Sequence, residues 1–382
     1  MTQQRVFFVG TQNEIGHHAA PLKEFISYSI VTPGEIFDCA QPGDLAIFYS
    51  EHFDRFRNAI RKLKENQVAT LYMIDGILEW RNAWINDVNE PACPFTMRPI
   101  LCDKAACIGH AQKRILDSWG NDGKTEVIGI PRFLRNQLRT QLAGDATKSL
   151  LIMTAKCPAY TDEQREKLLV SLRDIRNFVT NSPQWNAIWR LTDELEVELG
   201  VASQVNDFSG KELSQVLNTV DAVVTTSSTA MLEAMNASLP TAILDYHHYP
   251  HYAHAAWTIR SCDDVKLVLD ELYDPPAHAM DYQAFLLRDE LQLESCSAMR
   301  MVDLISQMQS VAKEAISKQQ PLRFPSLMLE HSAISTSAAS PHDSLYPSHQ
   351  EFKKTDLLEL QTELAHSRRE IMHLNRELTH VR

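Results

Sequence analysis

Short apolar runs alternate with amphipathic or polar stretches along residues 1–318. The apolar runs cover residues 5–9, 44–48, 68–74 and 126–130, and then 149–154, 187–191, 220–225 and 241–244. Their lengths suit β-strands, and their continuous hydrophobicity is typical of strands buried on both faces of a sheet. Between them lie helical or looped segments such as residues 53–66 and the helix expected at 161–177. This alternation predicts an α/β fold with parallel sheets covered by helices.

The alternating pattern occurs twice, which predicts two domains. The first covers residues 1–134 and the second residues 149–318, with the polar segment 135–148 as their connection. Hydrophobic residues make up 44% of the 382-residue chain, which is enough for two cores of ordinary size. The last expected helices, residues 282–291 and 296–317, would close the second domain and could also cross back to the first.

The rest of the chain has a different character. Residues 319–351 are rich in Ser, Pro and Ala, which predicts an unfolded linker. In residues 352–382, apolar side chains recur alternately three and four residues apart, with one polar interruption at Ser367. This heptad pattern predicts a parallel coiled coil and hence a homodimer. The alternative is a single amphipathic helix that folds back on the body.

Charge and cysteine usage narrow the class of protein. The net charge of −12 and the lack of a basic stripe argue against sequence-independent nucleic-acid binding, which needs phosphate neutralisation. The seven cysteines are scattered, and the sequence has neither a secretory signal nor an apolar stretch long enough to span a membrane. We therefore expect reduced thiols and a cytoplasmic protein, with a peripheral position at the inner membrane as an alternative.

A hydroxyl-rich turn follows the strand expected at residues 220–225. It consists of Thr226, Ser227, Ser228 and Thr229, and a helix is expected directly after it at residues 230–236. The first N–H groups of a helix lack partners within the helix, and its macrodipole favours negative charge. The turn is therefore a candidate anion site. The alternative is an ordinary capped helix of an α/β protein.

Residues 220–245 resemble the donor-site segment of GT-B glycosyltransferases in their order of strand, Thr/Ser-Ser turn, Leu-Glu-Ala helix, proline and second strand. The likeness is to those enzymes that make bacterial capsule, lipopolysaccharide and teichoic-acid-type polymers. It implies two Rossmann-like domains with the acceptor on the first and a nucleotide-sugar donor on the second. It also implies that Ser227, Ser228 and Thr229 hold the donor phosphates beside Thr226, and that Glu233 approaches a sugar or ribose hydroxyl.

Two further segments resemble the same family. Residues 107–133 lead through an expected helix and the strand 127–130 to Pro131-Arg132-Phe133, which resembles the turn that faces the interdomain cleft and implicates Arg132. Leu134 stands where the family often has Asp. Residues 71–82 end an apolar strand with Asp75-Gly76, similar to the acidic-Gly motif of capsule-type transferases and bacterial sialyltransferases. That likeness implies Asp75 as catalytic base.

Alternatives remain for this acidic segment. Asp75 could instead cap a helix that begins near Ile77, and Glu79 is a second candidate for the base. The family's usual Lys-x-His-Pro element is here Lys156-Cys157-Pro158, so its His is missing and Lys156 remains as the candidate cation for the donor.

Histidines supply the other candidates. His17 and His18 follow the first strand, where open α/β sheets bind ligands, and either could act as a base or simply cap or pack. The opening of that loop, residues 10–14, resembles the Gly-Thr-Arg-Pro-Glu start of UDP-N-acetylglucosamine 2-epimerases. His247 and His248 belong to a cluster that also contains His251 and His254. We expect this cluster to contact donor or acceptor, with metal binding as the alternative.

Two more groups are weaker candidates. Arg190 ends a strand and could face the donor or pair with Asp193. Cys102, Cys107 and His110 match no structural zinc spacing.

The sequence thus predicts a GT-B glycosyltransferase that moves a sugar from a nucleotide-sugar donor to a hydroxyl of a surface glycan or glycolipid. No cofactor or metal is expected, because helix N-termini and cations can stabilise the leaving diphosphate. One alternative is a nucleotide-sugar 2-epimerase. The other is a catalytically degenerate GT-B scaffold that acts through its coiled coil.

Overall fold

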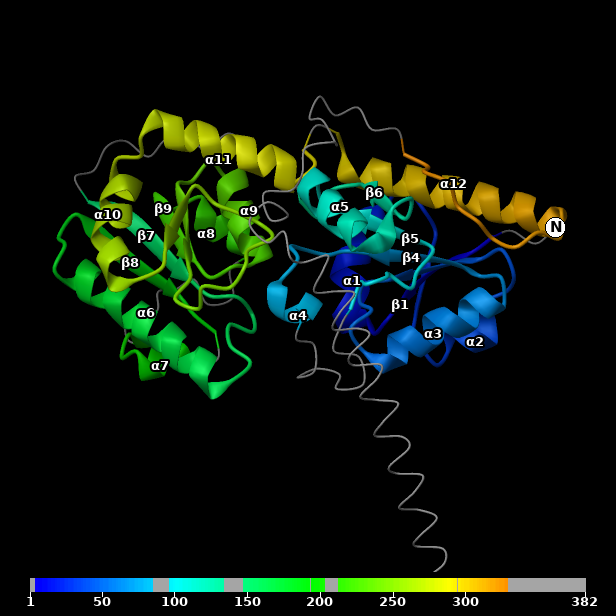
Figure 1. Ribbon diagram of the computed structural model, residues 1–382, viewed down its shortest axis with the longest axis horizontal. Coiled ribbons are helices and arrows are strands. Elements are labelled where there is room, and N and C mark those ends of the chain that lie inside the picture. Colours follow the sequence, from blue (N-terminus) through cyan, green and yellow to red (C-terminus); the bar gives the residue numbers. More distant parts are fainter. Residues whose placement is uncertain are drawn as a thin grey trace, which may run out of the picture. The chain divides into compact units, whose positions relative to one another are not determined.

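The computed structural model of the chain describes residues 4–84, 96–133, 147–192, 194–202, 212–293 and 295–328 (Figure 1). These residues fall within one compact unit. The coiled coil expected at residues 352–382 and most of the linker lie outside the described residues, as do Leu134, Asp193 and nearly all of the connection 135–148.

The first domain is built on a six-stranded parallel sheet with the strand order β2-β1-β3-β4-β5-β6. Its strands are β1 (Val6–Val9), β2 (Ser29–Val31), β3 (Leu45–Phe48), β4 (Ala69–Met73), β5 (Lys104–Cys107) and β6 (Thr125–Val127). Its helices are α1 (Gln12–Ala19), a 3-10 turn (Ala20–Leu22), α2 (Ile36–Cys39), α3 (Asp54–Glu65), α4 (Trp80–Trp84) and α5 (His110–Leu116), which continues into a wider turn (Asp117–Asn121).

The second domain is built on a five-stranded parallel sheet with the order β11-β10-β9-β7-β8. Its strands are β7 (Lys148–Met153), β8 (Trp185–Arg190), β9 (Ala222–Thr225), β10 (Thr241–Leu244) and β11 (Trp257–Ile259). Its helices are α6 (Asp162–Thr180), α7 (Leu195–Glu198), α8 (Leu213–Leu217), α9 (Thr229–Asn236), α10 (Cys262–Tyr273) and α11 (Ala277–Glu290). The two parallel sheets with their helices confirm the predicted α/β fold.

The last described helix returns to the first domain. Helix α12 (Ser297–Ser317) runs along the first sheet in Figure 1, beyond α11. Its Met301, Leu304 and Met308 are fully buried in one cluster with Phe8 of β1 and Leu71 of β4. The apolar stripe of this helix therefore completes the core of the first domain, although the domain boundary drawn from the sequence had placed it in the second.

The first residues of the expected linker are packed rather than free. Within residues 319–328, Leu322, Phe324 and Leu327 lie against the core of the first sheet. The backbone N–H groups of Leu327 and Met328 donate hydrogen bonds of 2.8 and 3.2 Å to the carboxylate of Glu126, which is buried on β6. The expectation of an unfolded chain from residue 319 onward is therefore wrong for residues 319–328, because their apolar side chains find a buried surface.

Two local expectations also need correction. Cys107, expected at the start of a helix, ends strand β5 instead. No helix begins near Ile77, since residues 74–79 are not helical and helix α4 starts only at Trp80.

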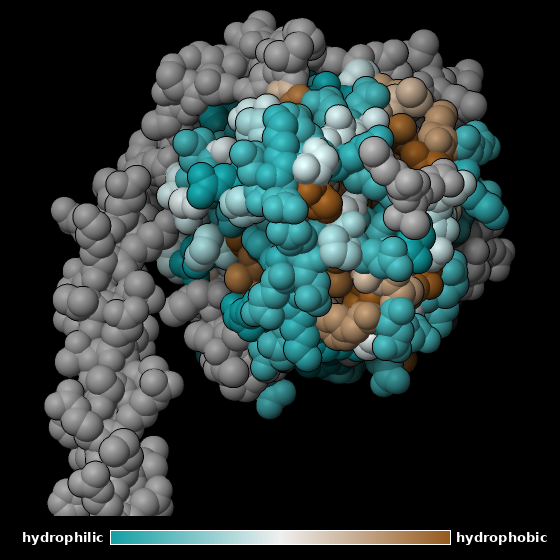
Figure 2. Space-filling model, turned by 90° about the vertical axis from the view of Figure 1, so that its right-hand side faces the viewer, coloured by the Kyte–Doolittle hydropathy of each residue, from teal (hydrophilic) through white to brown (hydrophobic). Residues whose placement is uncertain are grey.

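The surface is mostly hydrophilic where Figure 2 shows it, with small hydrophobic groups between the polar side chains. Among the helices of the described residues, none has the length and hydrophobicity that a membrane crossing requires.

Candidate functional site at the facing strand ends

The candidate site lies where the carboxyl ends of strands from both sheets come together. All strands of a parallel sheet end at the same edge, which is where open α/β sheets bind ligands. Asp75 follows β4 of the first sheet, and the turn 226–229 follows β9 of the second. The two edges are in contact here, because the N–H of Ile77 donates to Oγ1 of Thr229 over 3.2 Å.

Helix α1 carries His17 and His18 to this edge. The helix begins at Thr11, whose side chain accepts from the N–H of Glu14 while the Glu14 carboxylate accepts from the N–H of Thr11. This capping box fixes the first turn, and the two histidines lie in the last. Their ring centroids are 3.6 Å apart, with His18 buried and His17 exposed.

His18 is paired with Asp75. Its Nε2 lies 3.4 Å from Oδ2 of Asp75, whose side chain is 48% exposed. Burial alone would raise the pKa of the Asp75 carboxyl, but the hydrogen bond and charge of His18, together with the charge of Arg132, bring it below its ordinary value. Asp75 therefore interacts with a histidine of the same domain rather than capping a helix.

The environment of His17 favours the neutral form of its side chain, whereas that of Asp75 favours the charged form. Partial burial, the neighbouring His18 and the positive charge of Arg132 lower the pKa of His17, and the attraction of Asp75 opposes them only in part. His17 is therefore a largely neutral, exposed imidazole next to a carboxylate, which is the form that can accept a proton.

Arg132 connects the two domains. Its Nη1 lies 3.3 Å from Oε1 of Glu233 on α9, and its Nη2 donates to the backbone carbonyl of Asp75 over 3.4 Å. Burial raises the pKa of Glu233, although the charges of Arg132 and Arg190 lower it in part. The structure thus brings His17, His18, Asp75, Arg132 and Glu233 into one polar cluster.

The hydroxyls of the turn 226–229 have different partners. Oγ1 of Thr226 accepts from the N–H of Ala155 over 2.7 Å, and Oγ1 of Thr229 is held by Ile77. Ser228 is the N-cap residue of α9, is only 9% exposed, and its Oγ has no hydrogen-bond partner among the described residues. A buried hydroxyl without a partner costs free energy, and here it stands at the positive end of a helix dipole.

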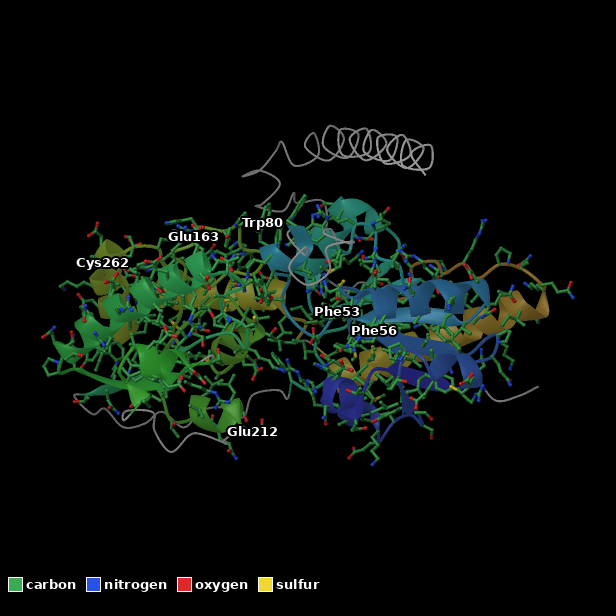
Figure 3. All side chains as sticks on the ribbon, turned by 90° about the horizontal axis from the view of Figure 1, so that it is seen from below. Phe53, Phe56, Trp80, Glu163, Glu212 and Cys262 are labelled. Atoms are coloured by element: carbon green, nitrogen blue, oxygen red, sulfur yellow. The ribbon has the colours of Figure 1, made fainter. Side chains whose placement is uncertain are left out.

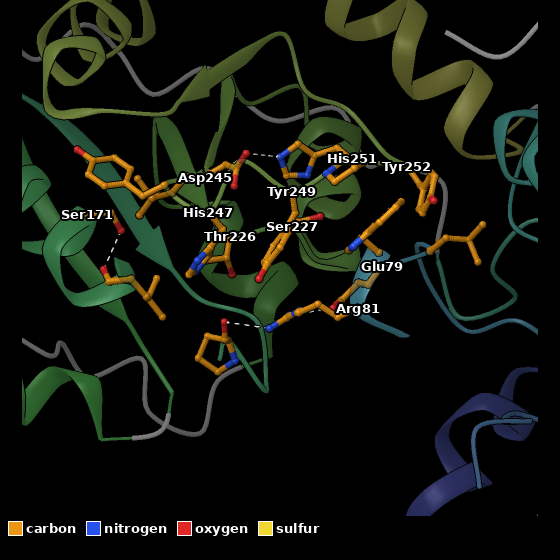
Figure 4. A pocket seen from close by; sticks show the side chains of 17 residues that line it. Glu79, Arg81, Ser171, Thr226, Ser227, Asp245, His247, Tyr249, His251 and Tyr252 are labelled. Atoms are coloured by element: carbon orange, nitrogen blue, oxygen red, sulfur yellow. Dashed lines mark hydrogen bonds and ion pairs between the residues drawn. The ribbon is translucent and has the colours of Figure 1, made fainter. Parts of the chain in front are cut away.

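A shallow pocket that is partly open to solvent lies beside this turn, with a cavity volume of about 60 Å³ (Figure 4). Thr226 and Ser227 contribute to one side, and the loop after β10 contributes His247 and Tyr249, whose rings are stacked with centroids 5.6 Å apart. The first domain contributes residues 78–81. The other lining residues are Pro158, Leu168, Ser171, Leu244, Asp245, Tyr246, Pro250, His251 and Tyr252. The pocket therefore places aromatic faces beside the candidate anion-binding turn.

Glu79 and Arg81 belong to the rim of this pocket. They form an ion pair with 2.9 Å between Nη2 and Oε2, and Arg81 also donates to the carbonyl oxygen of Pro158 over 3.3 Å. The guanidinium of Arg81 lies 4.2 Å from the ring centroid of Tyr160. Glu79 therefore faces the pocket beside the turn 226–229 and is held there by Arg81.

The four clustered histidines point to different partners. Nε2 of His251 is 3.0 Å from Asp245, and Nδ1 of His254 is 3.3 Å from Glu290. His248 is exposed, has a left-handed backbone with φ of 58°, and donates its backbone N–H to Asp245. Of these four, His247 and His251 line the pocket. Within the described ranges, no group of three His, Cys, Asp or Glu side chains is arranged to hold a metal ion.

The remaining cations lie around the cluster. Lys156 is exposed after β7, and its charge contributes to lowering the pKa of His17. Arg190 ends β8, and its charge acts on Glu233. Cys157, which stands where the related family has His, is exposed.

Two residues of the site were not among the predicted site residues, although Asp245 ends the segment 220–245 that resembles a glycosyltransferase donor site. Asp245 organises the loop after β10 by accepting from His248 and His251, and Tyr252 ends that loop. The position of Asp245 directly after a buried strand was a usable signal. Tyr252 had none, because its partners are distant in sequence.

Comparison with known proteins gives a family match for part of the sequence and fold matches among solved structures. Residues 134–247, which include the turn 226–229 and Glu233, match a family model described as "Putative glycosyltransferase (DUF6716)". A search among curated protein sequences finds no match.

Solved structures share the fold. A structure described as a "putative UDP-N-acetylglucosamine 2-epimerase" from Listeria monocytogenes is similar with a TM-score of 0.54, at 13% identity over 86% of this chain and 100% of that one. The UDP-GlcNAc 2-epimerase of Methanocaldococcus jannaschii, in complex with UDP-GlcNAc and UDP, has a TM-score of 0.52 at 10% identity, covering 80% and 99%. The lipopolysaccharide outer core galactosyltransferase WaaB has a TM-score of 0.48 at 11% identity, covering 79% and 99%.

The two sheets with facing strand ends are therefore the two Rossmann-like domains of the GT-B fold. The resemblance to glycosyltransferases is confirmed by the family description for residues 134–247. Likeness at such low identity concerns the fold alone, so the chemistry has to be argued from the site.

Proposed function

We propose that this protein transfers a sugar from a nucleotide-sugar donor to a hydroxyl of a surface glycan or glycolipid acceptor. The observation that carries the proposal is the buried Oγ of Ser228 at the start of α9, which has no partner among the described residues and follows Thr226 and Ser227, two residues that line a pocket with aromatic walls. Free N–H groups, a dipole and a spare hydroxyl together form a site for phosphate.

The donor would bind mainly to the second domain. Its diphosphate would lie at Ser227 and Ser228, and its base would lie in the pocket against the stacked rings of His247 and Tyr249. Glu233, one helical turn into α9, would accept a hydrogen bond from a sugar or ribose hydroxyl. Thr226 and Thr229 have the supporting role of holding the turn to β7 and to the first domain.

His17 is our candidate for the general base. It would take the proton from the acceptor hydroxyl, whose oxygen bonds to the anomeric carbon as the bond from that carbon to the donor diphosphate breaks. The pKa shifts favour His17 over Asp75, since the carboxyl is already paired with His18 and its pKa is lowered, which makes it a weak base. Asp75, whose negative charge favours the protonated form of His17, would stabilise the imidazolium that forms, while His18 holds Asp75 in place.

The leaving diphosphate needs positive charge. The N-terminus of α9, Arg132 and the nearby cations Lys156 and Arg190 would supply it, so the scheme requires no metal ion. Arg132 would have to exchange its bond to Glu233 for one to the donor, which is a small movement of a long side chain.

A nucleotide-sugar 2-epimerase remains the second candidate, because it shares the fold at the highest TM-scores reported above. The two activities differ in their products. A glycosyltransferase releases a nucleoside diphosphate only as an acceptor is consumed, whereas an epimerase converts the donor alone to an isomeric sugar.

Thermal unfolding with a panel of nucleotides and nucleotide sugars tests the proposal first. A ligand that binds only the folded state raises the unfolding temperature. We expect at least one nucleotide sugar to do so, and its turnover with and without a glycan acceptor then separates transfer from epimerisation. If the whole panel left the unfolding temperature unchanged, the donor site would not exist.

A further inference from the structure

One aromatic side chain of the second domain is part of the core of the first. Tyr252 follows β10 at the end of the pocket loop, which we define as residues 245–252, and it is only 5% exposed. It is buried in the same hydrophobic cluster as Phe48, Tyr72 and Trp119 of the first domain. The pocket loop is therefore fastened at its far end to the other domain.

Three tryptophans of the first domain surround this side chain, and we call Trp80, Trp84 and Trp119 the tryptophan socket. Nε1 of Trp84 donates to the Tyr252 hydroxyl over 2.6 Å. The Trp119 ring meets Tyr252 edge to face with centroids 5.4 Å apart, and Trp80 lies 6.2 Å away. Both the ring and the hydroxyl of Tyr252 thus have specific partners.

The socket itself is held together. Trp80 and Trp84 are stacked with centroids 5.1 Å apart, and Trp84 meets Trp119 edge to face at 6.0 Å. The guanidinium of Arg98 lies 3.4 Å from the Trp84 ring centroid. Trp80, labelled in Figure 3, begins helix α4 directly after Glu79 of the pocket rim.

Between β10 and Tyr252, the loop has its own internal support. Asp245 accepts from the N–H of His248 at 3.0 Å and lies 3.0 Å from Nε2 of His251. The backbone of His251 forms an antiparallel bridge with Glu79 of the first domain. The side chains of His247 and Tyr249, which form the wall of the pocket, lie between these fixed points (Figure 4).

We propose that Tyr252 is a positioning residue, whose insertion into the tryptophan socket holds the pocket loop in the shape that accepts the nucleotide and keeps the pocket rim, residues 78–81, against it. The part of this proposal that concerns the nucleotide rests on the proposed function. The structural part, that the socket fixes the loop, does not.

The structural part is tested without any ligand, by hydrogen exchange on the full chain. Three variants are compared: Tyr252→Ala, Tyr252→Leu, which keeps apolar volume in case the first does not fold, and Tyr252→Phe, which keeps the ring. Local opening exposes amides to exchange. We expect amides of residues 245–252 and 78–81 to exchange about ten-fold faster in the Ala and Leu variants and nearly as in wild type in the Phe variant.

Tyr273→Ala is the matched control. Tyr273 also packs against a tryptophan, Trp185, but at the other end of the strands of the second sheet, where β7 and β8 begin. This variant should leave exchange in the pocket loop unchanged. Equal exchange in wild type and Tyr252→Leu, or equally fast exchange in Tyr273→Ala, would overturn the proposal.

Calorimetry with UDP, CDP and GDP then tests the consequence for binding. If the competent loop falls to about a tenth of the population, the apparent affinity falls about ten-fold. We expect that loss in Tyr252→Leu, with Tyr252→Phe within about three-fold of wild type. Unaltered affinity in Tyr252→Leu despite faster exchange would refute the positioning role. Failure of all three nucleotides to bind wild type would instead contradict the proposed function, while the exchange result still decides the role of the socket.

Discussion

His17 and Asp75 illustrate how neighbouring residues shift the pKa of a side chain away from the value that its type suggests. The sequence motif made the carboxylate the leading base, because Asp75 follows an apolar strand and precedes a glycine. The structure places the buried His18 against it and leaves the exposed His17 with a lowered pKa. A motif shows which groups reach the edge of a sheet, but their protonation depends on contacts between elements that are separate in sequence.

The pH dependence of turnover follows from the direction of this shift. The pKa of His17 lies below 6.5, the ordinary value for histidine, so its neutral form should predominate at neutral pH and be lost on acidification. We expect kcat/KM to fall as pH decreases, with an inflection below 6.5 that disappears in His17→Gln. His278→Gln, at an exposed position on α11, is the control and should retain it. An inflection that persists in His17→Gln would assign the base elsewhere.

At the scale of elements, most strands were predicted from their apolar runs, and three strands were missed. Strand β10 was predicted at its observed bounds, and β9 and α9 within two residues. The missed strands are β2, β5 and β11. β5 reads Lys-Ala-Ala-Cys, which has low strand propensity and a lysine that suggests surface. Lys104 is fully buried because Glu126 on the neighbouring β6 pairs with it over 2.6 Å, and no local pattern shows that.

Contacts between elements also decided which hydroxyls of the predicted turn are free. The sequence placed four hydroxyls at the start of α9 as equivalent candidates. Two of them are held by backbone N–H groups, Thr226 by Ala155 and Thr229 by Ile77, which are far away in the chain. The sequence therefore could not show that the Oγ of Ser228 lacks a partner among the described residues while those of Thr226 and Thr229 have one.

Gly76 and Thr229 form a close contact between the two domains. A Cβ added to Gly76 would lie 2.0 Å from Oγ1 of Thr229. We predict that Gly76→Ala lowers the free energy of unfolding by about 1 to 3 kcal/mol, as measured by denaturant titration. Thr229→Ala removes the clashing oxygen, so the double variant should recover part of that loss, whereas Gly76→Ala combined with Thr229→Ser should not. Additive effects in the first pair would show that the contact is not formed.

At the scale of the whole molecule, the chain returns to its first domain before its C-terminal part begins. Helix α12 and residues 319–328 complete the first core, with Glu126 accepting two backbone hydrogen bonds from that segment. The prediction of an unfolded linker rested on the Ser and Pro content of residues 319–351, and it gave too little weight to the few apolar residues that pack against the core.

Two truncations test this end of the fold. A chain that stops after residue 328 keeps these contacts and should unfold at nearly the wild-type temperature. A chain that stops after residue 318 loses Leu322, Phe324 and Leu327 and leaves the Glu126 carboxylate without two donors. We expect it to be less stable by roughly 2 to 4 kcal/mol. Equal stability of the two chains would mean that the segment contributes nothing to the core.

The heptad pattern in residues 352–382 stays a prediction. A parallel coiled coil would make the full chain a dimer or larger by light scattering, and removal of residues 353–382 should leave a folded monomer. Ser367→Leu should strengthen the association, because it fills the polar position in the apolar seam. A full chain that is monomeric at micromolar concentration would refute the coiled coil.

The central claim, that the start of α9 binds the phosphates of a nucleotide sugar, is tested most directly by Ser228→Ala. Its Oγ is buried without a partner, so its removal should leave the stability of the empty protein unchanged or slightly higher. A hydrogen bond to a charged phosphate contributes about 1.5 to 3 kcal/mol, which corresponds to affinity weaker by roughly 10- to 100-fold. The measurement is calorimetric titration of wild type and Ser228→Ala with a nucleotide sugar that raises the unfolding temperature of wild type. Weaker binding at undiminished stability is the predicted result, and equal affinity of the two proteins would contradict the claim.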